Sequence, residues 1–127
     1  MVFPLPAEDY TGERISLEKE IIQHSHSTFF ARMEGDSMVN AFIAPGALLV
    51  IDSSREPQNM DLVLATVKGK FTVRYLKKND FKAWLVPANS KMRAQLIVPE
   101  MEVRFLGVII SIVTDPRMVP CVRMGGL

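Results

Sequence analysis

The chain has 127 residues, of which 48% are hydrophobic, and its formal net charge is +1. This length fits one domain with a hydrophobic core, and the near-neutral charge argues against binding DNA or an anionic membrane through bulk electrostatics. The single cysteine, Cys121, excludes an internal disulfide and a cysteine-based zinc site, and it fits a reducing compartment.

The first residues, MVFPLPAEDY, have neither the positive region nor the long apolar core of a signal peptide. Pro4 and Pro6 predict an extended arm over residues 1–12. The longest apolar run, FLGVIISIV at 105–113, has about half of the roughly 20 residues that a membrane-spanning helix needs, and it predicts a buried strand. We therefore expect a cytoplasmic protein with no membrane partner.

A short helix is predicted next, over the segment SLEKEII. Ser16 suits its N-cap, and Glu18 and Glu20 suit the positive end of the helix dipole. Lys19 stands where a capping box needs Glu or Gln, so that box is absent.

The segment HSHS follows the predicted helix and carries the only two histidines, His24 and His26. It predicts a solvated turn, because no third ligand stands at metal spacing. Neither a metal nor another cofactor is expected.

Strand-like runs then continue to residue 113, rich in β-branched and aromatic residues and separated by Gly and Pro. They are STFFARM, ALLVID, LVLATVK, KFTVRYL, AWLVPA, QLIVPE and EVRFLGVIISIV. The pattern predicts a mostly β, compact antiparallel domain over residues 13–114, with the one short helix at its start. TVKGKFTV predicts a hairpin around Gly69. Residues 115–127 are predicted to form a C-terminal tail without fixed structure.

Two further groups of side chains have predicted roles. Met33, Met38 and Met60 are predicted to lie in the core or in a pocket wall. The cluster RYLKK, with Lys82, suits either a basic face for DNA or a solvated edge strand protected by charge, and the edge strand is favoured. Direct sequence-specific DNA binding is not expected.

The tetrapeptide GDSM, at residues 35–38, places Ser37 between a glycine-led turn and an apolar residue. Such a serine is either a nucleophile at the end of a strand or an ordinary turn residue whose hydroxyl caps its neighbours. A serine hydroxyl is a poor nucleophile at neutral pH without a neighbouring base. With no suitable histidine, that base would have to be a lysine whose pKa is lowered by burial.

Five blocks occur in order along nearly the whole chain: GDSM, GALLVIDSS, GKFTVRYL, LVPANS and FLGVIISIV. Together they resemble the LexA/UmuD-type self-cleaving serine peptidases, most closely the UmuD-like members of SOS mutagenesis. The resemblance implies the catalytic-domain fold of that family, with Ser37 at the position of the nucleophile. It also implies that the backbone N–H groups of Asp36 and Ser37 are the oxyanion donors.

The family's general base is a lysine directly after FTV in the second hairpin strand, and here that position holds Arg74. Arginine has a pKa above about 12 and cannot take a proton from Ser37. Lys70 and Lys78 share its face by alternation but stand about 13 Å away along the strand, and Lys77 faces the opposite side. We therefore expect a serine–lysine dyad that is broken.

Two arrangements of the Arg74 side chain stay open. It is either a half-exposed strand arginine paired with an acidic residue, or a guanidinium that faces the pocket. In the second arrangement its acceptor is the Ser37 oxygen, a backbone carbonyl, or the carboxylate of Asp36 or Glu34, unless the side chain extends out to water.

The resemblance also implies partners. FPLPAEDY is similar to the segment just downstream of the family's scissile bond, so we expect a chain like the processed form, without its own cleavage site. That form implies a homodimer that regulates a Y-family translesion DNA polymerase, and additionally contacts a recombinase filament. The apolar strand EVRFLGVIISIV also favours a dimer.

Two alternatives remain. The first is an active Ser–Lys peptidase that cleaves itself or a partner chain. The second is the effector-sensing, dimerising domain of a phage-type repressor, although no helix-turn-helix fits ahead of Phe3.

Overall fold

The computed structural model describes residues 16–22 and 24–118, and every structural statement below concerns these residues. The arm predicted over 1–12 and the part of the tail from 119 onward, with Cys121, lie outside them. No helix in the described ranges has the length and apolar content that a bilayer crossing requires.

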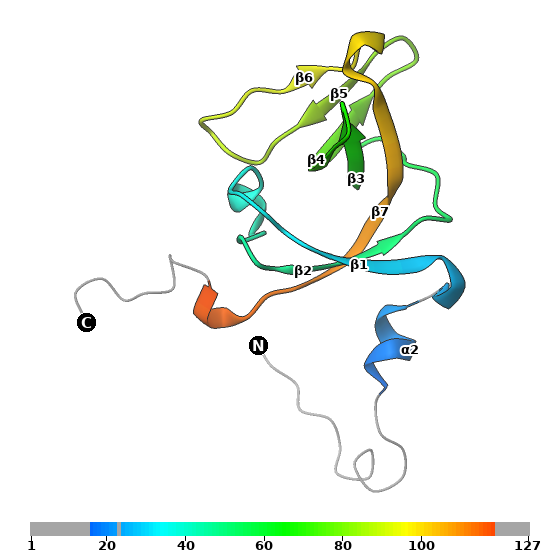
Figure 1. Cartoon of the computed structure of the whole chain (residues 1–127), viewed down its shortest axis with the longest axis vertical. Helices are drawn as coiled ribbons and strands as arrows, with labels where there is room; N and C mark the ends of the chain where they lie inside the picture. Colours follow the sequence, from blue (N-terminus) through cyan, green and yellow to red (C-terminus); the bar gives the residue numbers. More distant parts are fainter. Residues whose placement is uncertain (1–15, 23, 119–127) are drawn as a thin grey trace, which may run out of the picture.

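One antiparallel sheet of seven strands forms the domain, in the order β1-β2-β7-β3-β4-β5-β6. Within residues 16–22 and 24–118 one short α-helix, α2, precedes it, which confirms the predicted mostly β class with a short N-terminal helix (Figure 1). The strands are β1 (Thr28–Arg32), β2 (Leu48–Asp52), β3 (Leu62–Val67), β4 (Lys70–Lys78), β5 (Ala83–Val86), β6 (Gln95–Leu96) and β7 (Val103–Val113).

The helix α2 spans Leu17–Ile21 and begins where the sequence predicted. The Ser16 side chain accepts a hydrogen bond from the Lys19 backbone N–H at 3.4 Å, which confirms the predicted N-cap. The first backbone N–H groups of a helix have no acceptor within the helix, and the N-cap side chain supplies one of them with an acceptor.

Strand β7 joins two parts of the sheet. It pairs with β2 along one part of its length and with β3 along the other, and Figure 1 shows it running between the β1–β2 pair and the group of β3, β4 and β5. The register shifts once on each side, at Val50/Ile51 and at Leu64/Ala65. Such irregularities bend a strand and increase its local twist.

Only the centre of β7 is buried, at Gly107, Val108 and Ile109, so the predicted buried strand is right for its middle and wrong for its ends. A Cβ at Gly107 would lie 2.5 Å from the Cγ2 atom of Ile51 and 2.9 Å from the Asp52 carbonyl oxygen. Glycine therefore allows β7 to lie closely against β2.

The predicted hairpin around Gly69 is confirmed. Val67 of β3 pairs with Lys70 of β4, so the loop consists of Lys68 and Gly69, whose φ angles are 51° and 80°. Two successive positive φ angles are typical of the type I′ turn, whose twist matches that of the flanking strands.

Hydrophobic side chains pack on both faces of the sheet. Neighbouring residues of β3 and β7 enter different clusters: Val63 and Val108 join Leu76 and Leu85, whereas Leu64 and Ile109 enter the larger cluster. The larger cluster also contains Met33 and Met38, as predicted, together with Ile43, Ala47, Leu49, Ile51 and Val73. Met60 is 56% exposed, so its predicted place in the core or a pocket wall is wrong.

Two predictions about the later strands need correction. Strand β4, which carries RYLKK, is not an edge strand, because it pairs with both β3 and β5; the edges are β1 and β6. The predicted strand QLIVPE forms only as Gln95–Leu96, and a 3-10 turn at Pro99–Met101 follows. Proline has no N–H to donate to a strand ladder, so the predicted strand does not continue through Pro99.

Candidate functional site

Ser37 lies in a tight turn that follows β1. Gly35, with a φ of 77°, reverses the chain, and the Val39 N–H donates to the Asp36 carbonyl at 3.3 Å. Ser37 is 8% exposed, and the next side chain, Met38, is completely buried in the larger cluster. The buried methionine therefore fixes the position of the serine beside it.

A second segment, after β5, holds this turn in place. The Asn89 side-chain amide donates to the Asp36 carbonyl at 2.9 Å, and the Asn40 N–H donates to the Ala88 carbonyl at 2.7 Å. The Ala88 N–H lies 3.3 Å from the Met38 sulfur. These contacts come from LVPANS, one of the five blocks that carried the family resemblance.

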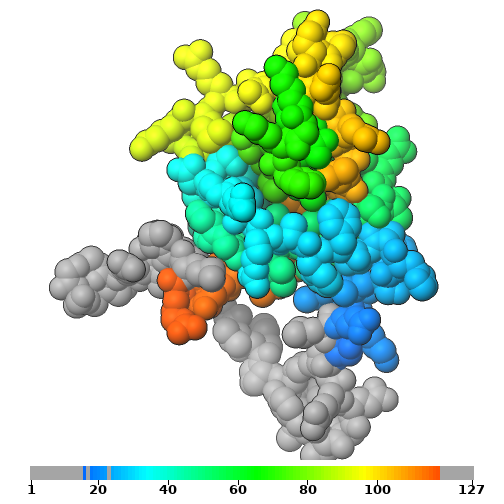
Figure 2. Space-filling model, in the orientation of Figure 1, coloured from blue at the N-terminus to red at the C-terminus, as the bar shows by residue number. Residues whose placement is uncertain are grey.

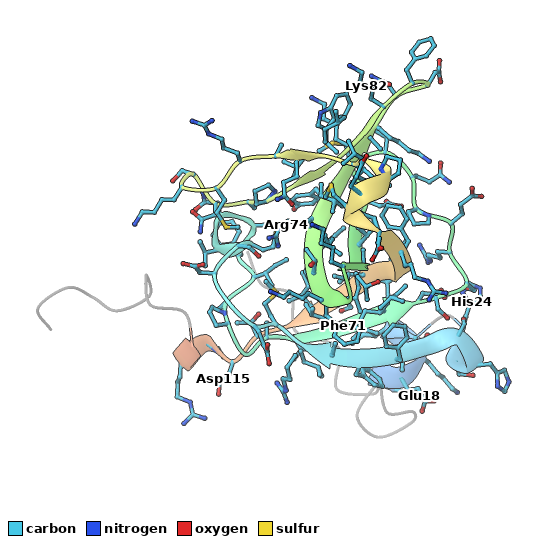
Figure 3. All side chains as sticks on the ribbon, turned by 45° about the horizontal axis from the view of Figure 1, so that its top comes forward. Glu18, His24, Phe71, Arg74, Lys82 and Asp115 are labelled. Carbon is cyan, nitrogen blue, oxygen red and sulfur yellow. The ribbon has the colours of Figure 1, made fainter. Side chains whose placement is uncertain are left out.

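Arg74 reaches the serine from β4. Its Nη1 atom donates to the Ser37 Oγ at 2.8 Å and to the Val73 carbonyl at 2.7 Å. Figure 3 shows the side chain extending from β4 toward the loop that follows β1. Of the two open arrangements, the structure has the pocket-facing one, with Ser37 and a backbone carbonyl as acceptors and no ion pair to an acidic residue of the described part of the chain.

Burial lowers the pKa of the Arg74 guanidinium from its ordinary value. An arginine nevertheless remains protonated in a protein at neutral pH, so Arg74 only donates hydrogen bonds. Ser37 is held by a cation rather than by a base.

A cavity of about 650 Å³ opens at this pair of residues. In Figure 2 the green atoms of the β3–β4 hairpin lie above the blue and cyan atoms of β1 and the following loop. The walls are largely apolar and come from these segments together with Met92. The residues that line the cavity are Phe29 to Ser37, Leu49, Leu64, Phe71 to Arg74, and Met92.

No lysine or histidine belongs to this lining. Lys78, which the sequence placed on the face of Arg74, donates through its Nζ atom to the Pro57 carbonyl at 3.1 Å. The lining therefore offers neither a lysine amine nor an imidazole as a base for Ser37, and the Ser37 hydroxyl forms no hydrogen bond to the two lining carboxylates, Glu34 and Asp36, within the described residues.

Several donors at the cavity have no acceptor within the described residues. The backbone N–H groups of Asp36 and Ser37 donate no hydrogen bond there, and neither do the Nε and Nη2 atoms of Arg74. Free N–H groups beside a serine Oγ have the chemical character of an oxyanion site.

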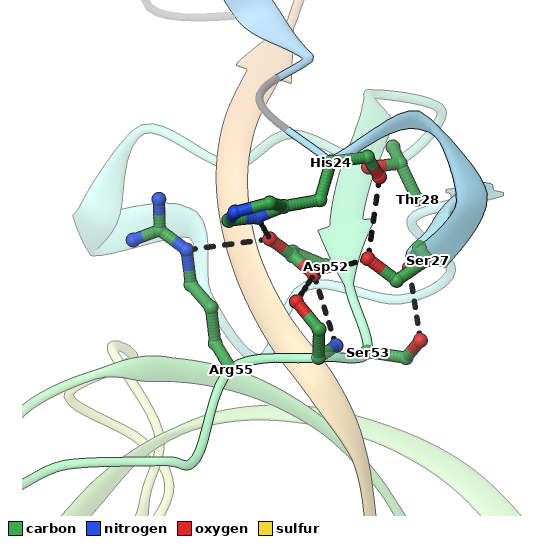
Figure 4. A network of polar contacts seen from close by, with 7 residues as sticks. His24, Ser27, Thr28, Asp52, Ser53 and Arg55 are labelled. Atoms are coloured by element: carbon green, nitrogen blue, oxygen red, sulfur yellow. Dashed lines mark hydrogen bonds and ion pairs between the residues drawn. The ribbon is translucent and has the colours of Figure 1, made fainter.

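A second polar cluster, around Asp52 at the end of β2, was not predicted from the sequence (Figure 4). The Asp52 side chain is fully buried and receives hydrogen bonds from the hydroxyls of Ser54 at 2.6 Å and Ser27 at 3.0 Å. His24 Nδ1 lies 2.7 Å and Arg55 Nε 3.4 Å from its other oxygen. Hydrogen bonds, that from Ser54 first and that from His24 second, hold the pKa of Asp52 well below its usual range.

The predicted solvated HSHS turn is therefore wrong for His24, whose ring binds the buried Asp52, although its side chain remains 57% exposed. The available signal was the segment IDSS, because an aspartate followed by serines favours a local turn in which the carboxylate accepts from the chain two residues on. Ser54 N–H donates to Asp52 in this way at 2.9 Å. Residues 16–22 and 24–118 contain no group of three metal-ligating side chains.

Comparison with known proteins decides the family. The model of the Peptidase S24-like family matches residues 2–110. The chain belongs to this family. Among S24-like relatives, protein SamA of Salmonella typhimurium strain LT2 is 36% identical over 115 residues, which cover 91% of this chain and 79% of the relative.

Two other S24-like relatives extend the comparison. Protein ImpA, found for example in Salmonella typhimurium, is 34% identical over 91% of this chain and 78% of its own length. LexA repressor 1 of Geobacter sulfurreducens is 31% identical over 86% of this chain and 54% of the repressor. The resemblance drawn from the five blocks is thereby confirmed.

Proposed function

We propose that this S24-like protein is a non-catalytic regulatory subunit of the UmuD type in SOS mutagenesis, in which Arg74 replaces the base of the serine–lysine dyad. The observation that carries the proposal is the 2.8 Å hydrogen bond from Arg74 Nη1 to Ser37 Oγ. A nucleophilic serine has to pass its proton to a neighbour, and a guanidinium accepts none.

An active Ser–Lys peptidase is the second candidate. Ser37 and the free N–H groups of Asp36 and Ser37 favour it, because they retain the parts that bind and stabilise an oxyanion. The missing part is the base.

Supplying that base tests the proposal. An Arg74→Lys variant, offered a separate polypeptide with the family's N-terminal arm, should cleave it slowly at alkaline pH, where a lysine is more often neutral. The unmodified chain should leave the polypeptide intact, as should the double variant with Ser37→Ala. Efficient cleavage by the unmodified chain, abolished by Ser37→Ala, would refute the proposal and favour the peptidase.

The quaternary part of the proposal is a homodimer. It is supported by apolar side chains that stay exposed at the end of β7 in the single chain, Ile112 at 37% and Val113 at 47%. Sedimentation at micromolar concentration should give a species of twice 14.3 kDa. A species of 14.3 kDa alone would contradict the dimer.

The partner part is binding to a Y-family translesion DNA polymerase in the cytoplasm, and to a recombinase filament. Its support is the similarity to UmuD-like relatives, and no contact within the chain identifies the surface used. Size-exclusion chromatography with a purified Y-family polymerase should give a joint peak. Separate elution at concentrations of tens of micromolar would contradict this partner.

A further inference from the structure

The cavity at Ser37 has hydrogen-bond donors to spare, a fixed positive charge and apolar walls. We propose that it binds the free C-terminal carboxylate of a partner polypeptide whose last side chain is apolar. This inference rests on the proposed function in one respect, namely that Ser37 performs no peptide-bond chemistry.

The first argument is the way Arg74 uses its donors. A guanidinium carries five N–H groups, and the two on Nη1 account for the bonds to Ser37 Oγ and to the Val73 carbonyl. The edge formed by Nε and Nη2 remains without an acceptor in the described residues. Two parallel N–H groups on such an edge match the two oxygens of a carboxylate.

The second argument is charge. Glu34 and Asp36 line the cavity but neither forms an ion pair with Arg74. Half-burying a cation without an anionic partner is unfavourable, and an incoming carboxylate supplies that partner. Arg74, without an ion pair among the described residues, therefore offers a cation to an anion, in a lining whose other charged side chains are Arg32, Glu34 and Asp36.

The third argument is the set of donors around the arginine. Ser37 Oγ accepts from Arg74 and donates to no described residue, so its own hydrogen is free. The N–H groups of Asp36 and Ser37 are free as well. These donors belong to residues that line the same cavity as Arg74, and they would add hydrogen bonds to a carboxylate beside the guanidinium.

The walls distinguish a peptide end from a small inorganic anion. Phe29, Phe30 and Phe71 line the cavity and are 36%, 54% and 76% exposed. An apolar side chain next to the carboxylate would cover part of this aromatic surface, at a gain of about 25 cal/mol for each Å² removed from water. A phosphate or sulfate ion leaves it exposed.

Strand β1 provides a path for the rest of the peptide. It is an edge strand, paired only with β2 among the described strands. The Ser53 N–H donates to the Ser27 carbonyl, so Ser27 and every second residue after it, Phe29 and Ala31, direct their backbone groups toward β2. The backbone groups of the alternate residues, Phe30 and Arg32, therefore point away from β2. An extended chain can add to such an edge through main-chain hydrogen bonds.

The test compares the affinities of the unmodified protein for two peptide probes. A fluorescein-labelled six-residue peptide that ends in leucine is made with a free carboxylate and as the C-terminal amide, and binding is followed by fluorescence polarisation. The free acid should bind at least about tenfold more tightly, because charged hydrogen bonds to Arg74 are lost in the amide. Equal affinity of the two probes, or no binding of either at millimolar concentration, would overturn the inference.

A matched pair of variants assigns the difference to Arg74. Arg74→Gln should bind acid and amide alike, while Arg104→Gln, at an exposed position of β7 outside the cavity, should keep the preference for the acid. Circular dichroism checks that both variants are folded. A preference for the acid that persists in folded Arg74→Gln would also overturn the inference.

Mass spectrometry of the same samples separates this inference from the proposed function. If the probes stay intact and bind equally well, the carboxylate inference is wrong and the proposed function is unaffected. Cleaved probes contradict the proposed absence of peptidase activity.

Discussion

Asp52 and Arg74 are two charged side chains withdrawn from water, and the protein treats them in opposite ways. The Asp52 carboxylate is completely buried and receives hydrogen bonds or ion pairs from Ser27, Ser54, His24 and Arg55. Arg74 is half-buried, has two neutral acceptors and keeps one edge free. A buried charge whose hydrogen-bonding capacity is filled stabilises the fold, whereas a charged group with unused N–H donors is available to a ligand.

Asp52→Asn should destabilise the protein most. We expect a larger fall in melting temperature than for Gly107→Ala, Arg74→Gln or Lys77→Gln. The new amide would present N–H groups to hydroxyls and cations that now donate to a carboxylate. Thermal unfolding at pH 7, with the exposed Asp80→Asn as control, measures the loss. An unchanged melting temperature would show that the Asp52 cluster is not structural.

The same variant has a distinct pH dependence. The pKa of Asp52 is depressed in the folded chain, so its stabilisation is present above the pKa of the unfolded chain, about 3.9, and is lost as the pH falls toward the folded value. The melting temperature of the unmodified protein should therefore fall more steeply below about pH 4 than that of Asp52→Asn. Parallel curves would contradict the assignment.

Gly107→Ala tests the backbone beside Asp52. Because the added Cβ would lie 2.9 Å from the Asp52 carbonyl oxygen and 2.5 Å from Ile51 Cγ2, β7 and β2 have to move apart. We expect a loss of about 1–3 kcal/mol in the free energy of unfolding, measured by urea denaturation. A loss below about 0.5 kcal/mol would mean that this contact relaxes freely.

Arg74→Gln should change stability much less than either replacement near Asp52. The bonds to Ser37 and Val73 are lost, but the cost of partly desolvating a guanidinium disappears with them. We expect a loss of at most about 1 kcal/mol in urea denaturation. A loss above about 2 kcal/mol would make Arg74 a structural residue and would weaken the contrast with Asp52.

The smallest effect is expected for a fully solvated charge. Lys77 is exposed, and its Nζ atom lies 5.9 Å from the centre of the Trp84 ring. Lys77→Gln should cost about 0.5 kcal/mol or less. Trp84 is the only tryptophan, so its fluorescence can follow the denaturation. A cost above about 1 kcal/mol would show that this pair is more than a surface contact.

The sequence predicted what depends on local chemistry. The hairpin followed from Gly69, the helix start from Ser16, and the β class from the strand-like runs. The catalytic-domain fold came from the resemblance carried by five ordered blocks. The position of Arg74 was predicted through the resemblance, but its contacts were left open. A rotatable side chain has several acceptors within reach, and only the folded chain selects among them.

The remaining features depend on residues distant in the sequence. His24 and Asp52 are 28 residues apart, and neither the segment HSHS nor the segment IDSS specifies the other. The interior position of β4 depends on β5 forming a partner strand, so the charges of RYLKK alone pointed wrongly to an edge. Pairing between strands is set by tertiary packing, which a single segment does not encode.

The place of β7 in the sheet also bears on how the chain folds. Residues 103–113 pair with β2, at 48–52, and with β3, at 62–67, so the central ladders close over long stretches of chain. Non-local pairings of this kind slow folding to milliseconds or longer, because loop-closure entropy is lost before the contacts form. A chain emerging from the ribosome N-terminus first exposes β2 and β3 without their shared neighbour. Because Met38 packs in the same cluster as Ile109 of β7, we expect the turn that carries Ser37 to reach its final geometry only after β7 has been synthesised.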